Sequence, residues 1–277
     1  MDCRISRFAV VFVLVILLMP VPGYAKNYVQ YFPNGRIDWA NGVIESIGVA
    51  CPQKNQSNAA QTRALTKRDA ETLAKENLLN VIREMRMDSR NSIGNYLVSA
   101  EFPAGELSGL LRRAELVDNH FLENGCVKTV LALRMTGRFA ELLLPKNIVS
   151  IDTVKQPLAG SRRAEGFSGL VVDCRAVAVK PAMVPAILDE DGNVVYGSGY
   201  ISREHAVRWG VVSYLRDLST AQNNLRVAPS ALVVKAIRVV KGRDSDVVIS
   251  NDDGAKITGN PSNLVFLQKG RVLFVVD

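Results

Sequence analysis

A long run of small and apolar residues limits most strongly what this chain can fold into. Ala70, Ala74, Leu78 and Ile82 recur at intervals of four, which places them along one stripe of an α-helix. The spacing predicts a helix over residues 59–86. Because the first half of the stripe is alanine, this helix can lie very close to a neighbouring sheet.

Strand signals flank the predicted helix on both sides. Between Ile37 and Val49 the apolar residues fall on odd positions, which predicts a half-buried strand that breaks near Asn41-Gly42. Downstream, Asn124-Gly125 separates two apolar runs. This dipeptide is a strong hairpin signal because both turn positions must accept positive φ. We therefore predict a hairpin of residues 110–121 and 127–135.

These elements make up a first unit over residues 36–145. A polar loop containing Gly94, Pro103 and Gly105 is expected after the long helix, and a short helix is expected over residues 138–144. The unit is predicted to be α+β, with the long helix packed on a small antiparallel sheet.

Residues 146–165 have the composition of a linker, and a second unit is expected over residues 166–277. It is predicted to be a mixed, strand-rich α+β domain with a hairpin that turns at 189–192 and a helix from Ser202 to about Leu218. The predicted strands cover residues 170–179, 231–240, 246–250 and 264–276. The chain as a whole is thus expected to be an α+β protein of two small domains.

The first 25 residues have the three parts of a secretory signal peptide. Arg4 and Arg7 precede an apolar run from Phe8 to Met19, and small residues follow up to Ala25. The run is shorter than the roughly 20 residues of a membrane span, so cleavage after Ala25 is favoured over an uncleaved anchor. We expect a periplasmic protein, with peripheral association with the outer membrane as the most that the sequence allows.

Cysteine placement adds two expectations. Cys3 precedes the apolar run, so the leader lacks the cysteine that a bacterial lipoprotein carries after it. Cys51, Cys126 and Cys174 remain, which leaves either one disulfide and one free thiol or three buried thiols. We hypothesise a Cys51–Cys126 disulfide, because the two residues flank strands that could end at the same side of one sheet.

The formal net charge of +7 is spread over both halves of the chain without a basic block or tail. A nucleic-acid-binding protein would concentrate its basic residues on one face or segment, so nucleic acid is not an expected partner. A solvated surface explains the charge, and a weak attraction to anionic envelope polymers or lipids is the alternative.

Histidine-based chemistry has little support in the sequence. His120 and His205 lie in different units, and no paired-histidine motif occurs. His205 could act as a base toward Ser198, but the surrounding Gly197-Ser198-Gly199 lacks the pattern of a hydrolase elbow. We expect His120 to be exposed and predict no catalytic residue.

Two acidic segments contain residue types that bind metal ions. Asp189-Glu190-Asp191-Gly192 departs from the calcium-loop pattern and is predicted to be a hairpin turn. The second segment is assigned to turns and helix caps, and its acidic residues are Asp244, Asp246, Asp252 and Asp253. A metal site would become arguable if the two segments met in space. No metal, cofactor or phosphate-cradle residue is predicted, and Trp39 and Trp209 are expected in the core.

The first unit resembles a known family of envelope proteins. The pattern consists of Trp39-Ala40-Asn41-Gly42, then Ile47-Gly48-Val49-Ala50, then the alanine-rich helix with Leu78-Leu79, and then the hairpin. Over residues 36–145 it is similar to the LPP-twenty surface-lipoprotein family and to the N-terminal domain of flagellar assembly protein T. The resemblance implies an envelope protein without catalytic residues, and some members build rings around the flagellar basal body.

Three functions follow from these observations. The favoured one is an exported, non-catalytic envelope protein that serves as a structural or assembly factor, with other envelope proteins or further copies of itself as partners. The alternative is a periplasmic module that binds a small ligand or polysaccharide in a pocket between the two units, lined with aromatic side chains and a few polar groups. An enzyme is the third and would require titratable groups that converge in a cleft.

Overall fold

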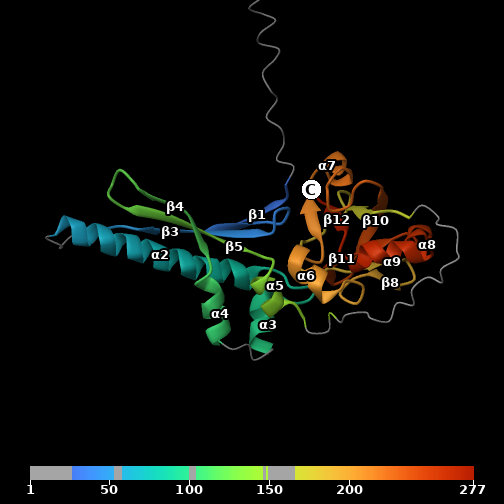
Figure 1. The fold of residues 1–277 in the computed structure, drawn as a ribbon, viewed down its shortest axis with the longest axis horizontal. Helices are drawn as coiled ribbons and strands as arrows, with labels where there is room; N and C mark the ends of the chain where they lie inside the picture. The colour runs from blue at the N-terminus through green and yellow to red at the C-terminus, as the bar shows by residue number, and fades with distance from the viewer. Residues whose placement is uncertain (1–26, 53–57, 100–103, 146–147, 149–165) are drawn as a thin grey trace, which may run out of the picture.

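The structure, a computed structural model, describes residues 27–52, 58–99, 104–145, 148 and 166–277 (Figure 1). Within these residues the chain is an α+β protein with two separate sheets, which confirms the predicted fold class. The predicted leader and almost all of the predicted linker lie outside the described residues. None of the helices in the described ranges is long and apolar enough to cross a membrane.

The first sheet is antiparallel, and its strand order is β1-β2-β3-β5-β4. Its strands are β1 (Val29–Phe32), β2 (Gly35–Asp38), β3 (Val43–Ala50), β4 (Glu115–Phe121) and β5 (Val127–Arg134). One long helix, α2 (Ala59–Glu84), runs along β3 and β5 and covers one face of the sheet (Figure 1). Together they form an arm that projects from the rest of the molecule (Figure 1).

The alanine stripe of α2 packs against β3 so closely that the backbones of the helix and the strand are nearly in contact. Ala70, Ala74, Leu78 and Ile82 are all fully buried, as the periodicity predicts. A Cβ atom built on Gly48 of β3 would lie 2.1 Å from the carbonyl oxygen of Ala70, so only glycine fits there. The neighbouring Ser46 hydroxyl donates to the Ala74 carbonyl at 2.8 Å. Small residues on both elements therefore let the helix lie directly on the sheet.

The turn predicted at Asn124-Gly125 is confirmed, and the strand break predicted near Asn41-Gly42 is a hairpin turn between β2 and β3. Because the chain reverses there, the buried residues of β3 are the even-numbered ones, and the predicted odd-numbered face is wrong for this strand. Gly42 has φ of 62° between β2 and β3, and Gly125 has φ of 79° between β4 and β5, a region that glycine enters without steric cost. A disulfide joins Cys51, just after β3, to Cys126, just before β5, as hypothesised. Cys174 is a buried free thiol. The hairpin strand itself starts at Glu115 rather than at residue 110.

The segment predicted as a polar loop after α2 instead contains two helices, α3 (Ile93–Ser99) and α4 (Ala104–Leu111). The Ser92 hydroxyl accepts a hydrogen bond from the Asn95 backbone, and the Ile93 side chain is fully buried. The glycines that suggested a loop are tolerated because Gly94 packs against the Arg83 backbone and Gly105 occupies the first turn of α4. The unit ends with α5 (Arg138–Leu143), close to the predicted short helix.

The second sheet is mixed, and its strand order is β8-β7-β11-β10-β6-β12-β9. Its strands are β6 (Gly169–Asp173), β7 (Ile187–Leu188), β8 (Val194–Tyr196), β9 (Ser213–Leu215), β10 (Ala231–Val240), β11 (Arg243–Ile249) and β12 (Val272–Val275). The central strands β10, β6 and β12 are parallel, and β6 and β12 are almost wholly buried. The accompanying helices are α6 (Arg203–Trp209), α7 (Leu218–Gln222), α8 (Asn251–Thr258) and α9 (Pro261–Gln268).

Three predicted boundaries in this unit are wrong. The helix capped by Ser202 stops at Gly210, whose φ of 75° ends it, and the later part of the predicted helix contains β9 and the first residue of α7. The predicted strand 264–276 is split into α9 and β12, because Asn260 caps a helix with Pro261 in its first turn. The strand predicted over 170–179 ends at Asp173.

The two sheets are tied together through one shared core. Trp39, at the end of β2, packs edge-on against Tyr214 of β9, and Tyr214 packs in the same way on Phe274 of β12. The Ser213 hydroxyl lies within hydrogen-bond distance of the Trp39 and Ala40 carbonyls. The two units therefore meet through packed side chains and direct hydrogen bonds.

Residues 86–89, which follow α2, dock on the second unit. Their backbone carbonyls at Arg86 and Met87 accept hydrogen bonds from Met183 and Val184. The buried Ser89 hydroxyl donates to Asp246 at 2.8 Å. This segment extends the contact between the units beyond the aromatic stack.

Candidate functional site

The serine and histidine considered as a hydrolytic pair are not partners. Ser198 lies in the turn that follows β8, whereas His205 lies in the first turns of α6. His205 Nδ1 is 2.7 Å from the hydroxyl of Ser202, which also accepts from the His205 backbone at 3.3 Å. His205 is therefore engaged at the helix cap. His120 is exposed on β4, as predicted, with Nδ1 2.9 Å from Asp118.

The two acidic segments do meet, but the contact between them is made by the amide side chain of Asn251 rather than by a shared metal site. Asn251, the first residue of α8, accepts from the Glu190 backbone at 3.0 Å and donates to the Asp191 carboxylate at 3.1 Å. Asp189 accepts from Asn193 within the predicted turn, and this hydrogen bond lowers the pKa of its carboxyl group. The described part of the chain contains no group of three or more His, Cys, Asp or Glu side chains suited to a metal ion.

The second acidic segment splits into three environments. Asp252 and Asp253 lie in the first turn of α8, where the helix dipole stabilises their negative charge. Asp244 pairs with Lys180 at 2.9 Å. Asp246 differs from the prediction, because it is buried in β11 and accepts from Ser89 and from the Ala186 backbone. Trp39 is in the core as expected, but Trp209 is 57% exposed.

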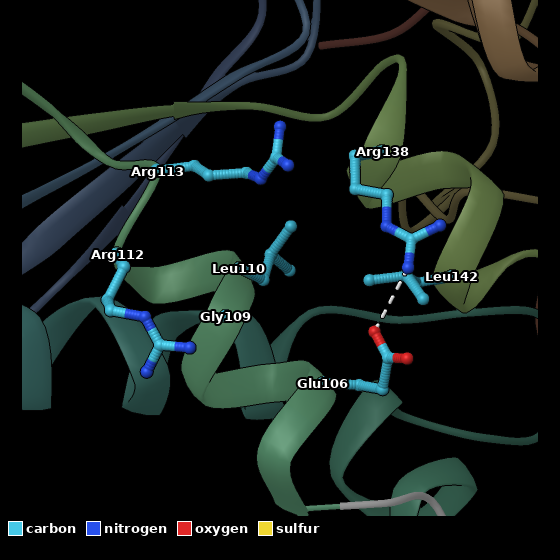
Figure 2. Close-up of a pocket in the computed structure, with 7 residues that line it drawn as sticks. All are labelled: Glu106, Gly109, Leu110, Arg112, Arg113, Arg138 and Leu142. Carbon is cyan, nitrogen blue, oxygen red and sulfur yellow. Dashed lines mark hydrogen bonds and ion pairs between the residues drawn. The ribbon is translucent and has the colours of Figure 1, made fainter.

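A pocket of about 440 Å³ lies between α4 and α5 (Figure 2). Its lining consists of Glu106, Gly109, Leu110, Arg112, Arg113, Arg138 and Leu142. Figure 2 shows Arg112 and Arg113 on one side and Arg138 on the other, with Leu110 between them and Leu142 beside Arg138. The pocket thus combines an apolar floor with three guanidinium groups.

The three arginines differ in their partners. Arg138 donates to Glu106 at 3.1 Å and to Glu141 at 3.2 Å, and the hydrogen bond to Glu141 is the chief cause that raises its pKa. Arg112 and Arg113 make no ion pair with any described residue. With both carboxylates counted, Arg138 is more than neutralised, and the remaining positive charge belongs to Arg112 and Arg113.

The pocket walls are held from behind by buried residues and by the second unit. Leu110 is 2% exposed, and Phe139, Ala140 and Leu143 bury the opposite side of α5. The Arg203 guanidinium of α6 donates to the Glu141 and Pro145 carbonyls at the end of α5. None of the pocket residues was singled out by the sequence, where the adjacent pair Arg112-Arg113 is the only local signal.

The arm also carries an uncovered surface. Along β3 the residues facing α2 are buried, whereas Ile47 and Val49 on the opposite face are 36% and 46% exposed. β4 forms one edge of the sheet, and its Leu116, Val117 and Phe121 are 54%, 59% and 44% exposed. We call this feature, residues 115–121, the β4 edge. Among the described residues, no strand pairs with the outer side of β4. Its outward-facing backbone N–H and C=O groups can therefore pair with a strand of another molecule.

The second unit is similar to a known domain family. Residues 169–277 match a family model described as the second domain of Tp0624 from Treponema pallidum. The match begins at β6 and ends at the last residue, so it covers the whole mixed sheet. No curated protein matches the chain. The family match does not reach the first unit, and the resemblance of that unit to the LPP-twenty family stays a prediction.

Proposed function

We propose that this chain is an exported, non-catalytic protein of the cell envelope that acts as a structural or assembly factor. The observation that carries the proposal is the arm, which is joined to the second unit through a shared core. Among the described residues its sheet is covered by α2 on one face, and its β4 edge pairs with no further strand. Because the arm is fixed to the second unit, it can present a binding surface at a defined position. Two units joined only by a flexible linker would not fix that position.

The β4 edge is the part of the arm best suited to contact another protein. Soluble proteins normally protect edge strands with charges, prolines or a covering segment. β4 carries Glu115, the Asp118–His120 pair and a bulge at Val117. Three large apolar side chains nevertheless stay exposed on this seven-residue strand. Strand addition would pair its free backbone groups and bury those side chains at once.

Export and envelope location rest on the sequence. The leader of residues 1–25 supports passage into the periplasm, and the resemblance of residues 36–145 supports a role beside envelope machines such as the flagellar basal body. The family match of the second unit names a domain of another bacterial protein and supports no particular activity.

Site-specific photocrosslinking in the bacterium that makes the protein tests the proposal. A benzophenone amino acid at Val117 on the β4 edge should give a discrete adduct with an envelope protein or a second copy. The same probe at Leu225, which is 93% exposed in the second unit, is the matched control. A monomeric periplasmic protein with no adduct specific to Val117 would contradict the assembly role.

A second variant separates contact from mere proximity. Val117→Lys places a charge on the edge strand, a substitution that natural proteins use to prevent strand pairing. Crosslinking from the neighbouring Leu116 should then be lost while thermal unfolding is unchanged, because residue 117 is 59% exposed.

The alternative of a ligand-binding module is favoured by one observation, the pocket between α4 and α5. It differs from the expected site in both place and chemistry. It lies within the first unit rather than between the units, and its walls carry arginines rather than aromatic rings.

A further inference from the structure

We propose that the pocket between α4 and α5 binds a phosphate monoester group attached to a small organic skeleton. The inference concerns a ligand of the first unit and does not depend on the assembly role, because the β4 edge lines no part of this pocket.

Charge is the first argument. Arg112 and Arg113 together present two positive charges that no described carboxylate neutralises. A phosphate monoester carries about −1.5 to −2 at pH 7 and can pair with both guanidinium groups, while the pocket carboxylate, Glu106, is already paired with Arg138. A carboxylate carries only one negative charge and would leave one of the two arginines without a partner.

Geometry is the second argument. Guanidinium groups bind phosphate oxygens through paired N–H donors, which makes arginine the side chain of choice for this group. Arg138 faces Arg112 and Arg113 across the pocket and is held in place by Glu106 at 3.1 Å and Glu141 at 3.2 Å (Figure 2). Its position is thus set before any ligand arrives, which lowers the entropic cost of binding.

The third argument is the size of the pocket and its partly apolar lining. The pocket volume of about 440 Å³ lies within the range of small-molecule sites, roughly 300–1,000 Å³, and exceeds what inorganic phosphate alone needs. Leu142, which is partly exposed beside Arg138, offers apolar surface to a carbon skeleton, and Leu110 packs beneath the pocket. A sugar phosphate or the headgroup of a phosphate-monoester lipid fits this combination.

Isothermal titration calorimetry on the purified mature protein tests the site with glucose 6-phosphate as the probe. Glucose, glucuronate and inorganic phosphate are the comparison ligands. We expect glucose 6-phosphate to bind, glucose not to bind, and glucuronate to bind at least about tenfold more weakly. Equal binding of glucuronate, or no heat with glucose 6-phosphate at about 1 mM, would overturn the proposal.

Variants locate the binding. Arg112→Ala/Arg113→Ala should weaken binding about tenfold or more, since charged hydrogen bonds are lost. Arg68→Ala/Arg134→Ala removes the same charge from exposed positions outside the pocket and should leave the affinity unchanged. Equal loss in both variants would show a non-specific charge effect and refute the site. Thermal unfolding of both variants verifies that they are folded.

Vesicles distinguish the source of the phosphate group. Phosphatidylcholine vesicles with phosphatidic acid present a phosphate monoester, and those with phosphatidylglycerol present only a diester of lower charge. Retention on the phosphatidic acid vesicles alone, lost in Arg112→Ala/Arg113→Ala, would identify a lipid headgroup. Binding of glucose 6-phosphate without vesicle retention would identify a soluble ligand. Equal retention on both vesicles would contradict recognition of a monoester.

Discussion

The hydroxyl of Ser89 donates a 2.8 Å hydrogen bond to the carboxylate of Asp246, a residue 157 positions further along the chain. Both side chains are buried, and Asp246 also accepts from the Ala186 backbone at 2.9 Å and pairs with Arg243 at 3.3 Å. The segment that follows α2 is thereby fastened to the strands of the second sheet. A buried carboxylate at this position makes the contact between the units sensitive to single substitutions.

Asp246→Ala should lower the free energy of unfolding by about 3 kcal/mol, because it leaves buried donors without an acceptor. Urea denaturation of the mature protein measures the change. Asp244→Ala, which breaks an exposed pair with Lys180, is the control and should leave the midpoint unchanged. Equal midpoints for the two variants would show that Asp246 does not couple the units.

Removal of the Cys51–Cys126 disulfide should cost about 2–4 kcal/mol, because the bond closes a long loop in the unfolded chain. Cys51→Ala/Cys126→Ala should denature at lower urea concentration than the oxidised protein, and a reductant should then have no further effect on that variant. An oxidised protein and a variant with the same midpoint would contradict a stabilising role for the bond.

The remaining thiol, Cys174, should be inert in the folded protein. Its side chain is fully buried, and burial raises its pKa, so little reactive thiolate forms at neutral pH. A thiol reagent should label the native protein only after denaturant is added. Rapid labelling without denaturant would show that the β6 end of the sheet opens readily.

Gly48→Ala should destabilise the arm by about 3 kcal/mol, since the added methyl group would overlap the backbone of α2 at Ala70 and Ala74. Gly105→Ala is the matched control. Nothing lies within 4 Å of its would-be Cβ in α4, so the same change should stabilise the helix by about 0.5–1 kcal/mol. Thermal unfolding of the two variants in opposite directions is the expected result.

Arg226→Ala should cost about 2–4 kcal/mol. The guanidinium donates to the carbonyls of Trp209, Gly210 and Gly270, each at 2.7 Å, and so joins the end of α6 to the turn before β12. Arg226→Lys keeps the charge but cannot reach all three carbonyls, so it should lose part of the stability. A lysine variant as stable as the natural protein would show that charge alone matters.

Local sequence signals predicted the arm well. The four-residue spacing of Ala70 to Ile82 indicated α2, and Asn124-Gly125 indicated the β4–β5 turn, because each depends on the residues of one element. The same reasoning failed over residues 264–276, where one apolar run is divided between a helix and a strand. Apolar composition there does not distinguish a buried helix from a buried strand, and the signals that mark the boundaries are the Asn260 cap with Pro261 and the positive φ of Gly270.

Local patterns in the sequence predicted the fold class, the long helix and the two hairpins, because periodicity and turn chemistry act within a few residues. They did not predict which face of β3 is covered, that Ser89 meets Asp246, that Trp39 packs edge-on against Tyr214, or that Arg138 lies across a pocket from Arg112 and Arg113. These pairs lie far apart in the chain. Their juxtaposition depends on how the two sheets and their helices pack, which no local pattern encodes.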